Sequence, residues 1–169
     1  MYVLEFPMGQ VPLLIVDGHR MSQSASILRF VAERFGLGGK DEFERARAAE
    51  IYGVFYDRAL EHFNYHMFLL KNPGQDDEIL YKKHFVPAVE KAIPFYEQAV
   101  KEANEHGGFV LKSGLSYGDF VIAEHLTSLF YIEPKLKRQH PKLAAFAENV
   151  YSVSPAIKEY VANRPKILV

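Results

Sequence analysis

The glycine-rich segment at residues 36–39, Gly-Leu-Gly-Gly, divides this sequence into two parts of different patterning. Before it, a short apolar run at residues 12–16 is followed by Asp17-Gly18, a dipeptide that suits the positive φ angles of a two-residue hairpin turn. After it, apolar residues recur at helical spacing. We therefore expect a small α/β piece over residues 1–39 and an all-helical domain over residues 40–169.

The first part predicts a strand, a tight turn, a second strand and a helix. Residues 19–21 form the expected return strand, and Ser22-Gln23-Ser24 has the chemistry of a helix N-cap. Apolar residues at helical spacing then continue to Gly36, which occupies a C′ position. A hairpin with one helix is marginally stable, and the apolar run is typical of a strand buried on both faces. We therefore expect further structure beside this strand.

The second part predicts about five helices. The strongest local signal is Ser116 followed three residues later by Asp119, a capping box in which each residue satisfies backbone N–H groups of the other. Pro87 and Pro94 are expected to bend the second helix. The expected helices cover residues 41–71, 78–104, 117–131, 141–151 and 155–164.

Composition excludes several classes of function. The net charge of the 169 residues is -1, without a basic stripe, so we expect no nucleic-acid partner and no membrane partner. The absence of cysteine excludes a disulfide framework, a thiolate nucleophile and a cysteine-containing zinc site. The N-terminus lacks the pattern of a secretory signal, and no apolar run reaches the roughly 18 residues of a spanning helix. We expect a cytoplasmic protein.

Two features of the long helix at residues 41–71 allow more than one interpretation. His62 and His66 have the i, i+4 spacing of a metal site, but the sequence offers no third ligand, so packing or surface roles are favoured and no metal is expected. An aromatic stripe on the same helix is consistent with an apolar co-substrate pocket, with a core or with a dimer contact. The stripe consists of Tyr52, Phe55, Tyr56 and Phe63.

Three motifs, in order and at compatible spacing, resemble the glutathione transferases, most closely the sigma class. They are the segment Met-Gly-Gln-Val-Pro-Leu-Leu-Ile-Val-Asp-Gly at 8–18, Gln23-Ser24 with Ile27, and Leu115-Ser116 with Asp119-Phe120. The resemblance extends over nearly the whole chain. It implies an α+β fold in which a partial thioredoxin-like, glutathione-binding piece over residues 1–39 precedes the all-α C-terminal domain of this family over residues 40–169.

The resemblance also implies a site for reduced glutathione, bound as a substrate. Val11 and Pro12 match a pair joined by a cis peptide bond, which turns the backbone of the valine toward the cysteinyl part of glutathione. Gln23 and Ser24 match residues at a helix N-terminus that receives the γ-glutamyl carboxylate, and Gln10 matches a residue that holds the other end of the tripeptide. Taken alone, Gln23 and Ser24 are typical helix-capping residues, and Pro12 is typical of a trans turn proline.

Asp57 matches an acidic residue that sigma-like enzymes place near the γ-glutamyl amine of the neighbouring subunit. A site completed across a two-fold axis would make a homodimer functional as well as structural. The alternative interpretation of Asp57 is an ordinary solvated charge on a helix face.

The family's first strand-helix-strand unit has no counterpart in this sequence. That unit carries the Tyr that stabilises the glutathione thiolate, so we expect no catalytic residue in this chain and an impaired activity. Tyr2 and Tyr52 do not stand in the matching position, and the Trp and Lys that usually precede the Gln-Val-Pro motif are also missing. The missing strands would have flanked the apolar run, for which Met1 to Phe6 offers only a short substitute strand.

Three hypotheses follow. The first is a sigma-like glutathione transferase that conjugates reduced glutathione to small apolar electrophiles, as in detoxification, or isomerises prostaglandin endoperoxides as some relatives do. The second is a non-catalytic module that dimerises with itself or with a full-length relative, or that binds hydrophobic ligands. The third is that the chain begins at an internal Met of a longer protein.

Overall fold

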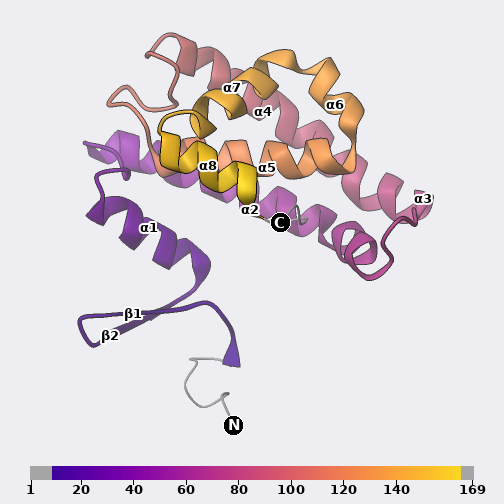
Figure 1. Ribbon diagram of the computed structural model, residues 1–169, viewed down its shortest axis with the longest axis horizontal. Helices are drawn as coiled ribbons and strands as arrows, with labels where there is room; N and C mark the ends of the chain where they lie inside the picture. Colours follow the sequence, from indigo (N-terminus) through magenta and orange to yellow (C-terminus); the bar gives the residue numbers. More distant parts are fainter. Residues whose placement is uncertain (1–8, 165–169) are drawn as a thin grey trace.

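The computed structural model describes residues 9–164, which form a hairpin, one helix beside it and a helical bundle (Figure 1). The Met1 to Phe6 segment, considered above as a substitute strand, lies outside the described residues. The elements in chain order are β1 (Leu13–Val16), β2 (His19–Ser22), α1 (Ser24–Arg34), α2 (Glu42–Lys71), α3 (Glu78–Leu80), the π-helical segment η2 (Tyr81–Phe85), α4 (Val86–Asn104), α5 (Tyr117–Ile132), α6 (Pro134–Gln139), α7 (Pro141–Tyr151) and α8 (Pro155–Asn163).

The hairpin is built as the sequence predicts. Strands β1 and β2 pair antiparallel in a register that runs from Leu13 opposite Ser22 to Val16 opposite His19. Asp17 and Gly18 take φ angles of 50° and 79°, which are the positive values of a type I′ turn. Within the described residues, the sheet consists of these two strands. Ile15 is 56% exposed, so the expectation of a strand buried on both faces is wrong for the described part of the chain.

Helix α1 ends in a Schellman motif, with Gly36 as its left-handed residue. Gly36 has a φ of 72°, and the N–H groups of Gly36 and Leu37 donate to the carbonyls of Glu33 and Ala32. These are the two hydrogen bonds of a Schellman motif, in which the left-handed C′ residue is usually Gly. The chain then turns into α2, whose N-cap Asp41 accepts a hydrogen bond from the N–H of Glu44 at 2.9 Å.

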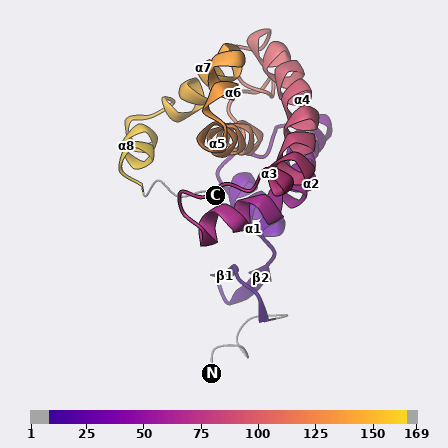
Figure 2. The same ribbon diagram turned by 90° about the vertical axis from the view of Figure 1, so that its right-hand side faces the viewer.

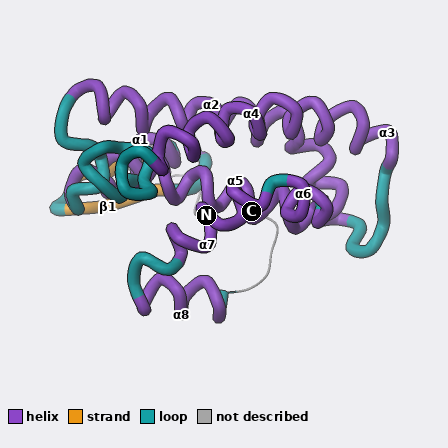
Figure 3. The backbone as a smooth tube through the Cα atoms, turned by 90° about the horizontal axis from the view of Figure 1, so that it is seen from above, coloured by secondary structure: helices purple, strands orange, loops and turns teal. Residues whose placement is uncertain are grey.

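The second long helix is less regular than expected. The prediction of one helix over residues 78–104 is correct in extent, but residues 81–85 are π-helical and separate the short α3 from α4. Pro87, which follows, has no N–H to donate to the carbonyl of residue 83, so the regular α-helical ladder is interrupted there. Helices α2 and α4 run side by side along one face of the bundle (Figure 3).

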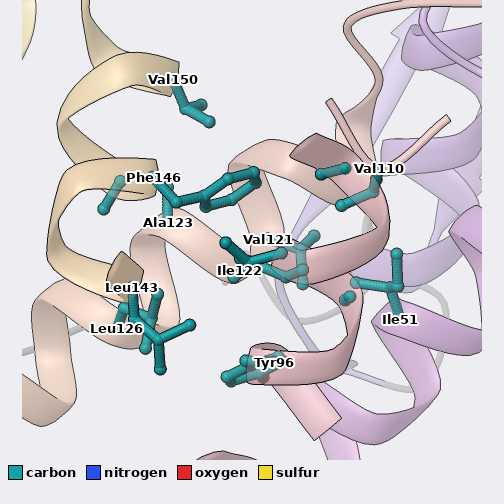
Figure 4. Close-up of a cluster of buried hydrophobic side chains, with 14 of the residues drawn as sticks. Ile51, Tyr96, Val110, Val121, Ile122, Ala123, Leu126, Leu143, Phe146 and Val150 are labelled. Carbon is teal, nitrogen blue, oxygen red and sulfur yellow. The ribbon is translucent and has the colours of Figure 1, made fainter. Parts of the chain in front are cut away.

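Helix α5 lies at the centre of the bundle, surrounded by α2, α4 and α7 (Figure 2). Its capping box is present: the N–H and the hydroxyl of Ser116 both donate to Oδ2 of Asp119 at 2.8 Å. The other oxygen of this buried carboxylate accepts the N–H of Val110 at 2.9 Å. Ile122 and Leu126 of the same helix are fully buried in the main core (Figure 4).

Helices α6 and α7 pack against α5, and α8 packs against α7. Helix α6, which begins at Pro134, was not predicted because it is only six residues long. Helices α7 and α8 begin at Pro141 and Pro155 as predicted. Glu124 of α5 accepts two hydrogen bonds from Arg164 and one from the hydroxyl of Tyr151, which holds the end of α8 against the bundle.

The architecture confirms the expected fold class, a short α/β piece followed by an all-helical domain (Figures 1 and 2). Within residues 9–164, no helix combines the length and the hydropathy needed to span a bilayer.

Candidate functional site

An open groove of about 660 Å³ lies between the start of α1 and one face of α2. We call it the α1–α2 groove. Its α1 side is formed by Gln23, Ser24, Ala25 and Leu28, and its α2 side by the aromatic stripe together with Ala59 and Leu60. A groove of this size, apolar on one wall and polar at one end, is typical of a small-molecule site. The co-substrate interpretation of the aromatic stripe is therefore compatible with where these side chains lie.

Gln23 sits at the polar end of the groove in an unusual conformation. Its φ is 74°, although it is not a glycine, and its side chain makes no capping hydrogen bond to α1. Its contact with the helix is through its backbone carbonyl, which accepts a hydrogen bond from the N–H of Ile27 at 3.0 Å. The interpretation of Gln23 as a side-chain cap is wrong. Since the first-turn N–H groups lack a side-chain cap, the positive end of the helix dipole at Ser24 is open to an anion.

The segment Gln10-Val11-Pro12 lies at the open end of the hairpin. The Val11–Pro12 peptide bond is cis, as expected, and the side chain of Val11 is largely exposed. Because Leu13 pairs with Ser22, the residues just beyond this pair, Pro12 and Gln23, are neighbours at the hairpin end. The three residues do not line the α1–α2 groove itself.

Asp57 lies on α2, directly after Tyr56 in the sequence, with an exposed side chain. Its Oδ2 atom is 3.7 Å from a guanidinium nitrogen of Arg58, which is a weak surface pair. Three large apolar side chains of α2, Tyr56, Leu60 and Phe63, are each at least half exposed along this face. The placement of Asp57 is compatible with both interpretations, a solvated charge and a group that faces another subunit.

Two tyrosines of the groove are candidates for contact with a thiol. Tyr52 stacks on Tyr56 with 6.2 Å between ring centroids and meets Phe55 edge-on at 5.7 Å. Burial raises the pKa of Tyr52 above its ordinary value, so its hydroxyl is neutral at physiological pH. A neutral hydroxyl can donate a hydrogen bond to a thiolate, but Tyr52 does not stand in the position that the family resemblance gives to the catalytic Tyr. Tyr2 lies outside the described residues.

The two histidines of α2 are packing residues. His62 and His66 are buried, and Nε2 of His62 lies 3.2 Å from Nε2 of His125 on α5. Nδ1 of His125 in turn hydrogen-bonds the hydroxyl of Tyr96 at 2.7 Å. Burial lowers the pKa of His62 to about 4 and that of His125 to about 3. The described residues contain no group of three side chains placed to hold a metal ion.

The fold and the groove together define a class of protein. In this class a thioredoxin-like piece precedes an all-helical domain, and the polar end of the binding groove lies near a cis-proline. Residues 61–164 match the family model described as "Glutathione S-transferase, C-terminal domain". The chain is similar to "Probable glutathione S-transferase 8" of Caenorhabditis elegans, with 34% identity over 95% of this chain and 76% of that protein. It is also similar to "Glutathione S-transferase 1" of Ascaris suum, with 32% identity over 95% of this chain and 76% of that protein.

Among solved structures, the chain is similar to a monomeric glutathione S-transferase of the hookworm Necator americanus, Na-GST-3. The TM-score is 0.85 with 32% identity, over 99% of this chain and 80% of that chain. The chain therefore belongs to the glutathione S-transferase family, and it is by family resemblance a glutathione-dependent transferase.

Three features of the site were missed by sequence reasoning. These are the positive φ of Gln23, the histidine contact between α2 and α5, and the way α1 closes one side of the groove. The second had a signal, since His125 lies three residues after Ile122 on a strongly apolar helix and must be buried there. The other two depend on tertiary packing and have no local sequence signal.

Proposed function

We propose that this chain binds reduced glutathione at the open end of the hairpin and conjugates it, through its sulfur, to small apolar electrophiles. The observation that carries the proposal is the uncapped start of α1, where Gln23 leaves the first-turn N–H groups open beside an apolar groove. The carboxylate of one ligand can bind at the start of α1, and a second, apolar ligand can bind in the groove beside it.

Glutathione fits this end of the hairpin in a defined orientation. Its γ-glutamyl carboxylate meets the start of α1, with Gln23 and Ser24 as the binding side chains. The backbone of Val11, turned by the cis bond to Pro12, receives the cysteinyl part, and Gln10 holds the glycine end. These assignments follow the family resemblance, and the exposure of Val11 and the pairing of Leu13 with Ser22 are compatible with them.

The chemistry is attack of the glutathione sulfur on an electrophilic carbon. A carbon–sulfur bond forms, the thiol proton passes to solvent, and the leaving group departs with its electron pair. Only the thiolate is a strong nucleophile. Tyr52 does not stand in the position of the family's catalytic Tyr, so we assign no residue of this chain to the stabilisation of the thiolate. The pH dependence of conjugation by this chain should therefore follow that of free glutathione in the same buffer.

The electrophile occupies the α1–α2 groove. Leu28, Phe55 and Ala59 present an apolar wall without a charged side chain, which favours small apolar substrates over charged ones. Prostaglandin endoperoxide isomerisation is a second reaction of the sigma-like type, and it requires the same thiolate.

A sigma-like homodimer, or a dimer with a full-length relative, is part of the proposal. The exposed Tyr56, Leu60 and Phe63 on α2 give an apolar face for the contact, and Asp57 beside them reaches the γ-glutamyl amine of the partner's glutathione. Sedimentation of the Leu60→Glu variant tests the contact, because a buried charge at a dimer interface returns the protein to monomers. A monomeric parent chain would contradict it.

We further propose that residues 1–39 act as the glutathione-binding unit and residues 40–169 as the supporting domain. We place the reaction in the cytoplasm because a chain without cysteine has no disulfide framework of the secreted kind.

Calorimetric titration of reduced glutathione into the purified chain tests the proposal. Saturable binding should weaken about tenfold in Gln23→Ala, the loss of one hydrogen bond to a charged group. Gln75→Ala, an exposed glutamine in the loop after α2, is the matched control and should bind like the parent chain. Absence of binding by a folded chain, or equal loss in both variants, would contradict the glutathione site.

Turnover separates the enzyme from the non-catalytic alternative. Conjugation of a generic aromatic electrophile above the uncatalysed rate, and dependent on Gln23, supports the transferase. Binding of glutathione without any increase in rate would mean that the chain keeps the family's ligand and has lost its chemistry.

A further inference from the structure

A second cavity lies on the opposite side of the helical bundle from the α1–α2 groove. It has a volume of about 430 Å³ and sits between the second half of α4 and the start of α7. Figure 2 shows these two helices on one side of α5 and the hairpin with α1 on the other. We call it the α4–α7 cleft. It shares no residue with the α1–α2 groove.

The floor of the α4–α7 cleft is apolar and its rim is polar. Val100 and Leu143 contribute to the floor, and both are buried members of the main core. The rim carries Lys101 and Lys142 together with the carboxamides of Asn104 and Gln139. An apolar floor beneath a few convergent polar groups is the usual construction of a small-molecule site.

The rim of the cleft carries more positively charged than negatively charged side chains. The only carboxylate that lines the cleft, Glu97, is already engaged, since its Oε1 lies 2.9 Å from Nδ1 of His140. Lys101 and Lys142 form no ion pair with any residue between 9 and 164, whereas Lys91 and Lys137 pair with glutamates. Two ammonium groups against the single carboxylate of Glu97 leave the lining with an excess of positive charge, which produces a positive local potential.

We propose that the α4–α7 cleft binds a small organic oxyanion, a molecule with a phosphate or carboxylate head on a compact apolar body. The head accepts hydrogen bonds from Lys101 and Lys142 at the rim. The body covers Val100 and Leu143. Asn104 and Gln139 each offer an amide donor for the remaining oxygens. The site is independent of glutathione, because its residues come from α4, the end of α6 and α7.

Titration calorimetry of the purified full chain with phenyl phosphate tests this site, with benzoate and benzyl alcohol as companion probes. Phenyl phosphate or benzoate should bind saturably, and neutral benzyl alcohol should bind at least about tenfold more weakly, because two exposed charge contacts are lost. The oxyanion that binds more tightly identifies the head group. Equal binding of all three probes, or no binding of either anion, would overturn the proposal.

Charge variants place the bound anion. Lys101→Gln combined with Lys142→Gln should weaken its binding about tenfold, while Lys101→Arg combined with Lys142→Arg keeps the charges and should retain most of the affinity. Lys83→Gln combined with Lys158→Gln, two exposed lysines outside the cleft, is the matched control. Saturating glutathione and Gln23→Ala should leave the affinity unchanged. Loss of binding in the control, or competition by glutathione, would overturn the α4–α7 cleft as the site.

Discussion

The hairpin with α1 and the helical bundle differ in how they bury their apolar residues. In α1 the fully buried residue is Ala32, and Ile15 of β1 is more than half exposed. In α5 most residues are buried, and Ile122 and Leu126 have no exposed surface. The bundle thus has a core of its own, whereas the hairpin and α1 depend on contacts to neighbouring structure for stability.

The same two regions also have different proposed roles, which are glutathione binding and support of the fold. The proposed glutathione contacts, such as Gln23 and Val11, lie in the exposed piece, and the core that supports them lies in the bundle. Binding segments are often drawn from the less stable parts of a protein, where local opening costs little free energy. The four predictions below test whether stability and binding divide between the two regions in this way.

The largest expected contrast is between two isoleucines. Ile122→Ala removes a fully buried side chain from α5 and should lower the free energy of unfolding by about 3 kcal/mol. Ile15→Ala removes a mostly exposed one from β1 and should cost less than about 1 kcal/mol. Urea denaturation followed by circular dichroism measures both. Equal losses would show that the hairpin is packed as firmly as the bundle.

A second contrast concerns pH. His62 and His125 are neutral in the folded core because burial lowers the pKa of each, to about 4 and about 3. Unfolded histidines have a pKa near 6.5 and bind protons first, so this contribution is fully present above about pH 6.5 and is lost as the pH falls toward 4. Between pH 7 and pH 5 each of the two histidines should lower the free energy of unfolding by about 2 kcal/mol.

Urea denaturation at each pH, with one histidine variant from each region, tests this assignment. His62→Gln removes one of the two groups and should flatten the pH dependence. His19→Gln, on the exposed hairpin strand β2, is the control and should leave it as steep as in the parent chain. An unchanged slope in His62→Gln would locate the titration elsewhere.

The two regions also differ in how far the sequence predicts them. Local signals were sufficient where the structure is local: Asp17-Gly18 specified the hairpin turn, and Ser116 with Asp119 marked the start of α5. They failed where packing decides. Residues 81–85 became π-helical, and the six residues of α6 are too few to show a periodicity.

The candidate site was predicted in part for the same reason. Its residues could be named from motifs, and the cis bond at Val11–Pro12 is present. The backbone of Gln23 could not be predicted, because a positive φ at a non-glycine residue is imposed by the surrounding fold and not by the residue itself.

A third, smaller contrast is between two helix starts. Ser154 caps α8 by accepting the N–H of Ile157 at 3.2 Å, so Ser154→Ala should cost about 1 kcal/mol of stability. Gln23 makes no such bond at the start of α1, so Gln23→Ala should leave the free energy of unfolding nearly unchanged while it weakens glutathione binding. Urea denaturation of both variants decides the point. A loss of stability in Gln23→Ala comparable to that in Ser154→Ala would restore the capping interpretation.

The smallest expected effect has the opposite sign. Gln23 holds a φ of 74°, a region that glycine adopts without a steric penalty. Gln23→Gly relieves that penalty but increases the conformational entropy of the unfolded chain, and the balance should be a stabilisation of about 0.5 kcal/mol. Glutathione binding should weaken as in Gln23→Ala, because both variants lack the carboxamide. Thermal denaturation and calorimetry on the same samples measure the two effects. A variant that gains stability and loses affinity would show that the backbone at this position is held for the ligand, whereas a loss of both would mean that the Gln23 side chain also supports the fold.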